Sequence, residues 1–161
     1  MPQEKRQNGT GHKRIPQMKR GTIWDPLRKR EVALTPEEEV RQRFISLLMS
    51  KMLVPAHLMM SEVGFRLGDK PFRADILIYD RKALPLAVVE CKRPDVELDT
   101  TVLDQAVRYN MVLNVKYIII TNGRRTHICR RKDGGKAAEY EFISYAPTYE
   151  EMLGTEKPTE K

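Results

Sequence analysis

Asp75, Glu90 and Lys92 are the residues whose types and spacing suit metal-dependent chemistry on a phosphodiester. Glu90 and Lys92 are two residues apart at the end of an apolar stretch, so their side chains share one face if that stretch is a strand. Such charges are costly to bury unless they are paired or coordinated. A turn after the upstream stretch that holds Asp75 would bring its carboxylate beside Glu90. Adjacent carboxylates repel each other, and their hard oxygens favour Mg²⁺ or Mn²⁺.

The tripeptide Glu90-Cys91-Lys92 is weak evidence without its surroundings. Asp80-Arg81-Lys82 has the same pattern, but it lies in an expected turn where solvation explains it. Only the second tripeptide ends an apolar strand and has an aspartate on a neighbouring strand. The alternative is a structural ion pair between Glu90 and Lys92, and the residues alone leave both interpretations open.

A helix predicted after this strand adds polar groups that could hold a phosphodiester. Gln105 and Tyr109 are four residues apart and share a helix face, and Arg108 is adjacent. The alternative assigns Gln105 to the surface and Tyr109 to the core, with its hydroxyl at the rim. Cys91 and Cys129 lie in apolar runs and are expected to be buried thiols rather than zinc ligands.

The N-terminal part of the chain predicts a hairpin followed by a long helix. Residues 22–34 have the pattern of a short hairpin or extended arm. Thr35 is the expected N-cap of the helix, with Pro36 in its first position, Glu38 completing a capping box and Pro55 ending it. The buried stripe of this helix is expected to contain Val40, Phe44, Leu47, Leu48 and Met52.

Strand and helix patterns alternate through the rest of the chain. The predicted strands are Leu58–Leu67, Arg73–Tyr79, Leu84–Lys92, Val115–Thr121 and Arg125–Arg131, with Ala138–Ser144 as an optional edge strand, and the predicted helix is Thr100–Leu113. The first three strands form an antiparallel meander, whereas the crossover through the helix places the third and fourth strands parallel. The sequence therefore predicts an α/β fold with a mixed β-sheet of about five strands flanked by α-helices.

Composition and charge fit one globular domain with a polyanionic partner. The 161 residues carry a formal net charge of +7. With neither a membrane-spanning run nor the apolar segment of a secretory signal, a cytoplasmic protein without membrane contact is expected. Residues 1–20 are expected to be a disordered basic tail, either solubilising or binding phosphates non-specifically. The domain is expected to cover residues 21–153, and residues 154–161 a frayed tail.

Asp75, Glu90-x-Lys92 and Gln105-x-x-x-Tyr109, in this order and on these elements, resemble the PD-(D/E)xK nuclease superfamily. Over residues 23–150 the chain also resembles the N-terminal nuclease domain of type I restriction enzyme R subunits, above all its short stand-alone relatives. The residues that carry this likeness include Leu34-Thr35-Pro36-Glu37-Glu38, Val40-Arg41-Gln42, Glu62-Val63, Arg73-Ala74-Asp75-Ile76, Val89-Glu90-Cys91-Lys92-Arg93-Pro94, Asp104-Gln105, Arg108-Tyr109-Asn110 and Thr121-Asn122-Gly123. The resemblance implies a restriction-endonuclease-like sheet.

The resemblance also implies a Mg²⁺- or Mn²⁺-dependent deoxyribonuclease. Asp75, Glu90 and the backbone carbonyl of Cys91 would bind the metal, and Lys92 would orient a water or neutralise the phosphate. Gln105 and Tyr109 would complete the catalytic group. The acids Glu38 and Glu62 are further candidates for the metal site, although the capping box also explains Glu38. The candidates for contacts with DNA phosphates are Arg73, Arg93 and Arg108.

Two departures from the family pattern limit what can be carried over. Ala74, rather than proline, precedes Asp75, a departure that many members of the superfamily tolerate. The chain has no Gly-x-x-x-x-Gly-Lys-Ser/Thr phosphate loop, so only the nuclease module, and not the ATP-driven motor, is implied. Restriction–modification subunits would then act in trans. The alternative function is a catalytically inactive module on the same fold that binds DNA or docks a partner.

Overall fold

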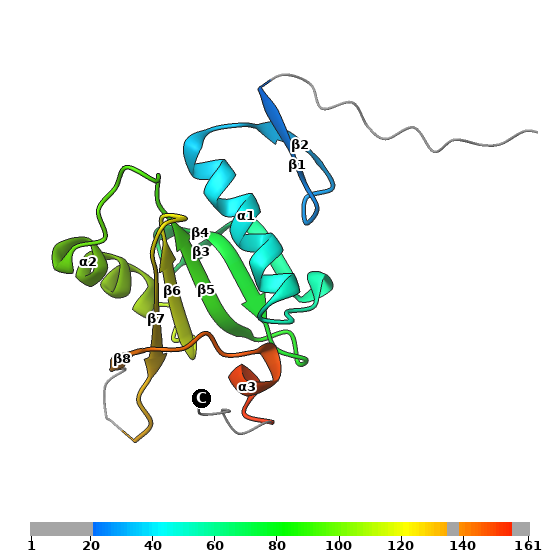
Figure 1. The fold of residues 1–161 in the computed structure, drawn as a ribbon. Coiled ribbons are helices and arrows are strands. Elements are labelled where there is room, and N and C mark those ends of the chain that lie inside the picture. The colour runs from blue at the N-terminus through cyan, green and yellow to red at the C-terminus, as the bar shows by residue number, and fades with distance from the viewer. Residues whose placement is uncertain (1–20, 135–138, 156–161) are drawn as a thin grey trace, which may run out of the picture.

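A six-stranded mixed sheet with one long helix on each face is the centre of the fold (Figure 1). The computed structural model describes residues 21–134 and 139–155. The elements are β1 (Thr22–Asp25), β2 (Arg30–Ala33), α1 (Pro36–Ser50), the 3-10 turn η1 (Ala56–Leu58), β3 (Met59–Leu67), β4 (Lys70–Tyr79), β5 (Pro85–Cys91), α2 (Thr100–Met111), β6 (Tyr117–Thr121), β7 (Thr126–Arg131), β8 (Tyr140–Ile143) and α3 (Tyr149–Leu153). None of the described helices is long and apolar enough to cross a membrane.

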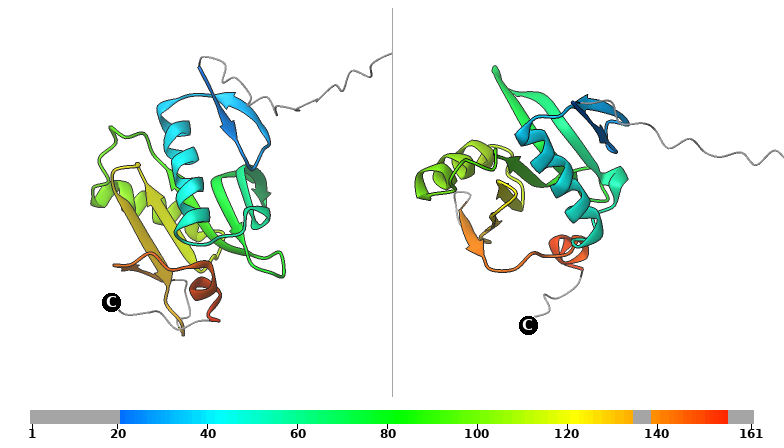
Figure 2. Two further views of the ribbon diagram at one scale, coloured as in Figure 1. Left: turned by 45° about the vertical axis from the view of Figure 1, so that its right-hand side comes forward. Right: turned by 45° about the horizontal axis from the view of Figure 1, so that its top comes forward.

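The sheet has the strand order β3-β4-β5-β6-β7-β8. Strands β5 and β6 are parallel and are joined through α2, and every other neighbouring pair is antiparallel. This confirms the predicted mixed α/β fold, with six strands where about five were expected. The predicted hairpin at residues 22–34 is the separate β1–β2 pair, which lies beside the beginning of α1 in the two views of Figure 2.

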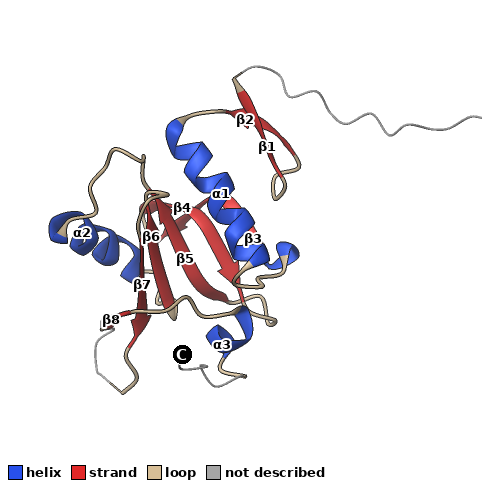
Figure 3. Ribbon diagram, viewed as in Figure 1, coloured by secondary structure: helices blue, strands red, loops and turns tan. Residues whose placement is uncertain are grey.

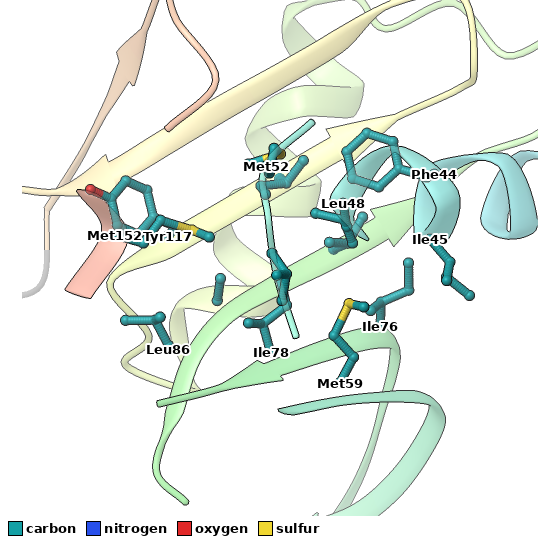
Figure 4. Close-up of a cluster of buried hydrophobic side chains, with 14 of the residues drawn as sticks. Phe44, Ile45, Leu48, Met52, Met59, Ile76, Ile78, Leu86, Tyr117 and Met152 are labelled. Carbon is teal, nitrogen blue, oxygen red and sulfur yellow. The ribbon is translucent and has the colours of Figure 1, made fainter. Parts of the chain in front are cut away.

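Strands β5 and β6 lie at the centre because their side chains are apolar on both faces. One face packs against α1 and α3, and its buried cluster includes Leu48, Ile76, Ile78 and Met152 (Figure 4). The other face packs against α2 through Leu77, Ile118, Leu103 and Ala106. Both cysteines are buried and free, as predicted.

Helix α1 begins as the sequence predicts, but Glu38 does not close a capping box. The hydroxyl of Thr35 accepts a hydrogen bond from the backbone N–H of Glu38 at 3.0 Å. The Glu38 carboxylate instead faces Arg28, Arg41 and Gln42. The buried stripe contains Ile45, whereas the predicted member Leu47 is 40% exposed, and the helix ends at Ser50, before Pro55.

Helix α2 is rotated relative to the predicted face. Asp99 caps it by accepting a hydrogen bond from the N–H of Val102 at 2.9 Å. The buried residues are Leu103, Ala106 and Asn110. The prediction instead placed Val102, Ala106, Tyr109 and Leu113 on that face, and of these only Ala106 is fully buried.

The sequence reasoning missed the short helix α3. Thr148 and Glu151 form a reciprocal capping box, and Tyr149 and Met152 enter the core below α1. The Tyr149 hydroxyl donates to the carbonyl of Tyr79 at 2.9 Å. Figure 3 shows this helix packed near the lower end of the sheet. The predicted tail at residues 1–20 lies outside the described residues, as does most of the predicted tail after residue 154.

Candidate active site

A polar pocket of about 350 Å³ lies where β4, β5, α1 and α2 meet, and it brings the predicted triad together. Asp75, Glu90 and Lys92 all line it although they come from separate stretches of the chain. The strand register explains this, because Ile76 pairs with Val89 and the next step of the antiparallel ladder sets Asp75 against Glu90. The other lining residues are Glu37, Glu62, Arg73, Ala74, Val89, Cys91, Tyr109 and Asn110.

Strands β3 and β4 are irregular where Glu62 and Asp75 enter the pocket. Ala74 and Leu77 pack under α2, whereas Ile76 packs under α1, so the two faces do not simply alternate along β4. On β3, Glu62 stands between ladder residues with a left-handed φ of 54°. Such a conformation is unfavourable for a residue with a Cβ and is found preferentially at functional sites. Glu62 and Asp75 thus reach the same pocket from neighbouring strands.

The carboxylates of Asp75 and Glu90 are held at all four oxygens. Asp75 accepts from the backbone N–H of Cys91 at 2.7 Å through Oδ2 and from Nη2 of Arg41 at 3.0 Å through Oδ1. Glu90 lies 2.6 Å from Nζ of Lys92 through Oε1 and accepts from Nδ2 of Asn110 at 2.8 Å through Oε2. The expected juxtaposition of Glu90 and Lys92 is therefore an ion pair that opens into the pocket rather than one on a plain surface.

Arg41 is the cation at the centre of the acidic side of the pocket. Its side chain is only 4% exposed and contacts Glu38, Glu62 at 2.5 Å and Asp75 at 3.0 Å. Glu38 also bonds Arg28 at 2.8 Å, and Arg28 bonds the buried Asp25, which ties the β1–β2 hairpin to the pocket. The residue of α1 that lines the pocket is Glu37, and not the predicted Glu38.

The remaining predicted site residues are distributed over several surfaces. Tyr109 lines the pocket, stacks on Phe72 with centroids 4.6 Å apart and bonds the backbone of Arg73 at 3.2 Å. Gln105, one turn earlier, is exposed and is not among the lining residues. Tyr109 is 47% exposed, so it is not a core residue, and it lies at the site because it lines the pocket.

The three predicted phosphate contacts differ in their surroundings. Arg73 lines the pocket and is paired with Glu62. Arg93 lies outside it and is paired with Asp95 at 3.0 Å. Arg108 faces a separate groove between α2 and β8 that Cys129 and Phe142 also line.

Burial and charge act together on the titratable groups of the pocket. Burial, helped by the charge of Asp75, raises the pKa of Glu37 despite the opposing charges of Arg41 and Lys92. Burial alone would lower the pKa of Lys92, but its hydrogen bond to Glu90 and the nearby acids raise it, so Lys92 stays protonated. Burial and the charge of Asp75 raise the pKa of the Cys91 thiol well above its usual value, which leaves that thiol neutral.

The sequence pattern gave no role to Glu37 and Asn110, which line the pocket, or to Arg41, which binds the pocket residues Glu62 and Asp75. The signal for Arg41 was present, because it follows Glu37 and Glu38 by about one helical turn and so shares their face. Within the described residues, no group of three His, Cys, Asp or Glu side chains is arranged to hold a metal. An ion would therefore rely on two carboxylates supplemented by backbone oxygen and water, which is common for Mg²⁺.

Comparison with known proteins assigns the family. Residues 36–147 match the family described as type I restriction enzyme R protein N terminus (HSDR_N). The chain belongs to this family. The matched range includes Asp75, Glu90 and Lys92, and it extends from the first residue of α1 to the loop before α3. No curated protein matches the chain.

A solved structure of an R-subunit fragment has the same fold as this R-protein N-terminal domain. It is a fragment assigned to an HsdR subunit of a type I restriction enzyme from Vibrio vulnificus YJ016. The two superpose with a TM-score of 0.53 at 21% sequence identity, over 75% of the present chain. The chain spans a quarter of the length of that fragment, covering 25% of it.

Proposed function

We propose that this chain is a Mg²⁺- or Mn²⁺-dependent deoxyribonuclease module of the PD-(D/E)xK type. The observation that carries the proposal is the meeting of Asp75 with Glu90 and Lys92 in one pocket across the β4–β5 ladder. A nuclease needs hard oxygen ligands and a cation beside the scissile phosphate, and these three residues offer both.

The chemistry of the donor set fits a hard divalent ion. Asp75 and Glu90, with the carbonyl of Cys91, are the groups that would hold it, whereas Glu62 lines the same pocket but is paired with Arg41 and Arg73. Burial, and after it the charge of Asp75, raises the pKa of Glu37, so a cation bound in the pocket would favour the ionised form of this carboxyl group. When bound, such an ion polarises the phosphodiester and lowers the pKa of a coordinated water.

The protein's own side chains would position and neutralise the substrate. Lys92 remains protonated and faces the pocket, where its charge can offset the charge that develops on the phosphate. Asn110 holds one oxygen of Glu90 and so fixes the orientation of that carboxylate. Tyr109 lines the pocket, and its hydroxyl is hydrogen-bonded to the backbone of Arg73 on β4.

A second candidate is a catalytically inactive module on the same fold that binds DNA or docks a partner. The observation that favours it is Arg41, because its buried guanidinium already neutralises Asp75 and Glu62. If Arg41 is a permanent counter-ion, the acids are a structural network and the pocket does not cut.

Type I restriction enzymes contain several subunits, and we propose that the chain acts in the cytoplasm on DNA together with restriction–modification subunits supplied in trans. The family match and the likeness to an HsdR fragment support this assignment. The proposal covers the nuclease module alone and includes no motor activity.

Cleavage of plasmid and linear duplex DNA in Mg²⁺ or Mn²⁺, beside an EDTA control, tests the proposal. Asp75→Asn and Lys92→Ala should each reduce the cleavage rate by at least about 100-fold. Lys51→Ala, at the far end of α1, is the surface control and should cut like the wild type. Equal nicking by all four proteins would show a contaminant and sink the assignment, whereas metal-independent DNA binding without cleavage would favour the second candidate.

A further inference from the structure

The β6–β7 turn presents two arginines next to the candidate active site. Arg124 and Arg125 are exposed at its tip. From the part of the chain that the structure describes, neither side chain receives an ion-pair or hydrogen-bond partner. In contrast, Arg73 and Arg93 are each paired with a carboxylate, Glu62 and Asp95 respectively. Among the described residues, the free cations near the site are therefore not the ones that the sequence pattern suggests.

The turn is held by contacts that fix its conformation. The Asn122 side chain accepts from the backbone N–H groups of Arg124 at 2.9 Å and Arg125 at 2.8 Å, and it donates to the carbonyl of Val96 at 2.9 Å. Gly123 has a φ of 82°, and a Cβ there would lie 3.2 Å from Cγ2 of Val40 on α1. The two arginines therefore project from a rigid base that is packed on α1 and on the β5–α2 loop.

Backbone pairing links this turn directly to the residues of the pocket. Cys91 pairs with Thr121 in the parallel β5–β6 ladder, and the N–H of Lys92 donates to the carbonyl of Thr121 at 2.8 Å. Figure 1 shows the turn, the loop after β5 and the beginning of α1 at one end of the sheet. Only a few residues along neighbouring strands thus separate Lys92 from Arg124.

The local charge beside the turn is positive. A hollow of about 270 Å³ is lined by Arg124 and Arg125 together with Asp95 and Glu97. Asp95 is neutralised by Arg93, which leaves one carboxylate, that of Glu97, facing two arginines. A surface of this kind attracts a phosphate chain more than an acidic or neutral peptide, because closely spaced phosphates give every exposed arginine a partner.

We propose that Arg124 and Arg125 bind backbone phosphates of duplex DNA that flank the bond held in the pocket. This inference rests on the proposed function for its choice of DNA. The two arginines are positioning residues: they hold the duplex by its backbone and leave the chemistry to the pocket. They carry no base preference, because contacts to phosphates are independent of sequence.

Binding of a fluorescently labelled duplex of about 25 base pairs, measured by anisotropy in EDTA over a salt series, tests the proposal without any cleavage. Arg124→Ala/Arg125→Ala in the full chain should weaken binding about tenfold or more at low salt. The slope of log K against log salt concentration should become less negative by about 1.8, or about 0.9 for each phosphate that an arginine no longer neutralises. Arg124→Lys/Arg125→Lys keeps both charges and should retain the slope.

The control is Lys51→Ala/Lys82→Ala, which removes the same charge from exposed positions after α1 and in the β4–β5 turn, away from the two arginines. An equal loss of affinity in this control, or an unchanged slope in the arginine-to-alanine protein, would overturn the proposal, as would a wild type that binds no duplex. Because the assay contains no metal, a protein that binds through the turn but never cuts contradicts the proposed function and leaves this inference standing. A protein that cuts DNA but binds it equally well without the two arginines would support the proposed function and overturn this inference.

Discussion

Nη2 of Arg41 lies 3.0 Å from Oδ1 of Asp75, so the first acid of the predicted triad is paired with a buried guanidinium from another element. Arg41 also contacts Glu38 and Glu62, and the chain of contacts continues through Arg28 to Asp25 in the β1–β2 hairpin. The pocket is therefore coupled to α1 and to the hairpin as well as to the sheet.

Arg41→Met should destabilise the protein strongly. It leaves Glu38, Glu62 and Asp75 without their shared cation in a buried setting, and breaking such a network by removing one partner costs about 3–5 kcal/mol. The free energy of unfolding in urea measures this. Arg43→Ala on the same helix is the control, because its pair with Glu39 is exposed and should contribute less than about 1 kcal/mol. Similar losses of stability in both variants would show that the Arg41 network is not a stabilising unit.

Asn110→Ala should slow DNA cleavage by about 10- to 100-fold, because it frees Oε2 of Glu90 from the amide that orients it. The comparison is Gln105→Ala, an exposed change on the same helix. A steady-state or single-turnover cleavage assay on linear DNA separates the two. If Gln105→Ala has the larger effect, the family motif is the better guide to the site than the contacts of Glu90.

Glu37→Gln should stabilise the metal-free protein at pH 7. Burial and the charge of Asp75 raise the pKa of Glu37, so the folded state favours its protonated form. The stability that protonated Glu37 contributes to the folded state is fully present below the unfolded pKa of about 4.3. It is lost as the pH rises through the higher pKa of the folded state. The gain at pH 7 should stay below about 1 kcal/mol because the side chain is 42% exposed, and it should vanish near pH 4.

The response of Glu37→Gln to Mg²⁺ tests whether Glu37 belongs to the cation site. If Glu37 belongs to the cation site, Mg²⁺ should raise the melting temperature of Glu37→Gln less than that of the wild type. Glu39→Gln, next to an exposed pair with Arg43, should behave like the wild type in both respects. A Mg²⁺-induced shift in Glu37→Gln as large as that of the wild type would exclude Glu37 from the site.

Asp25 should make the protein sensitive to acid. Burial raises the pKa of this carboxyl, but hydrogen bonds from Arg28, Ser61 and the backbone N–H of Leu27 outweigh it, and the pKa falls to about 2. Because the folded pKa is lowered, the stabilisation is present above about pH 4 and is lost as the pH falls toward 2, amounting to roughly 2 kcal/mol.

Urea unfolding between pH 2 and pH 6 measures the contribution of Asp25. The pH dependence should be weaker in Asp25→Asn than in the wild type, whereas Asp69→Asn, in the exposed β3–β4 turn, should keep it. An Asp25→Asn protein with the full acid sensitivity would contradict the assignment.

Local rules predicted most of the fold correctly. The apolar runs of β5 and β6 gave the central parallel pair, and Thr35 and Pro36 gave the start of α1. What failed depended on three-dimensional packing: α2 is turned so that Asn110, rather than Tyr109, enters the interior to bind Glu90. The helical periodicity of the sequence does not show that Asn110 rather than Tyr109 is buried, because the partner of Asn110, Glu90, lies on another element.

In the candidate active site, too, local sequence rules predicted some residues, and three-dimensional packing placed the others. The spacing of Asp75, Glu90 and Lys92 predicted a shared pocket because strand register converts sequence distance into adjacency. Glu37 reaches this pocket, and Arg41 reaches its residue Asp75, through the placement of α1 against the sheet, and that placement is set by the core rather than by any motif. The helix α3 was missed although Thr148 and Glu151 carry a capping signal, because five residues are too few to show helical periodicity.

The parallel β5–β6 ladder has a geometric consequence for the two sites at its end. Lys92 and Thr121 are joined backbone to backbone at 2.8 Å, so the separation of the acidic pocket from the Arg124–Arg125 turn is set by main-chain hydrogen bonds and does not vary with side-chain rotamers. If both sites engage one duplex, the distance between the phosphates bound by the arginines and the cleaved bond is constant. The cut would then fall a constant number of phosphates from those that the arginines bind, whatever the base sequence between them.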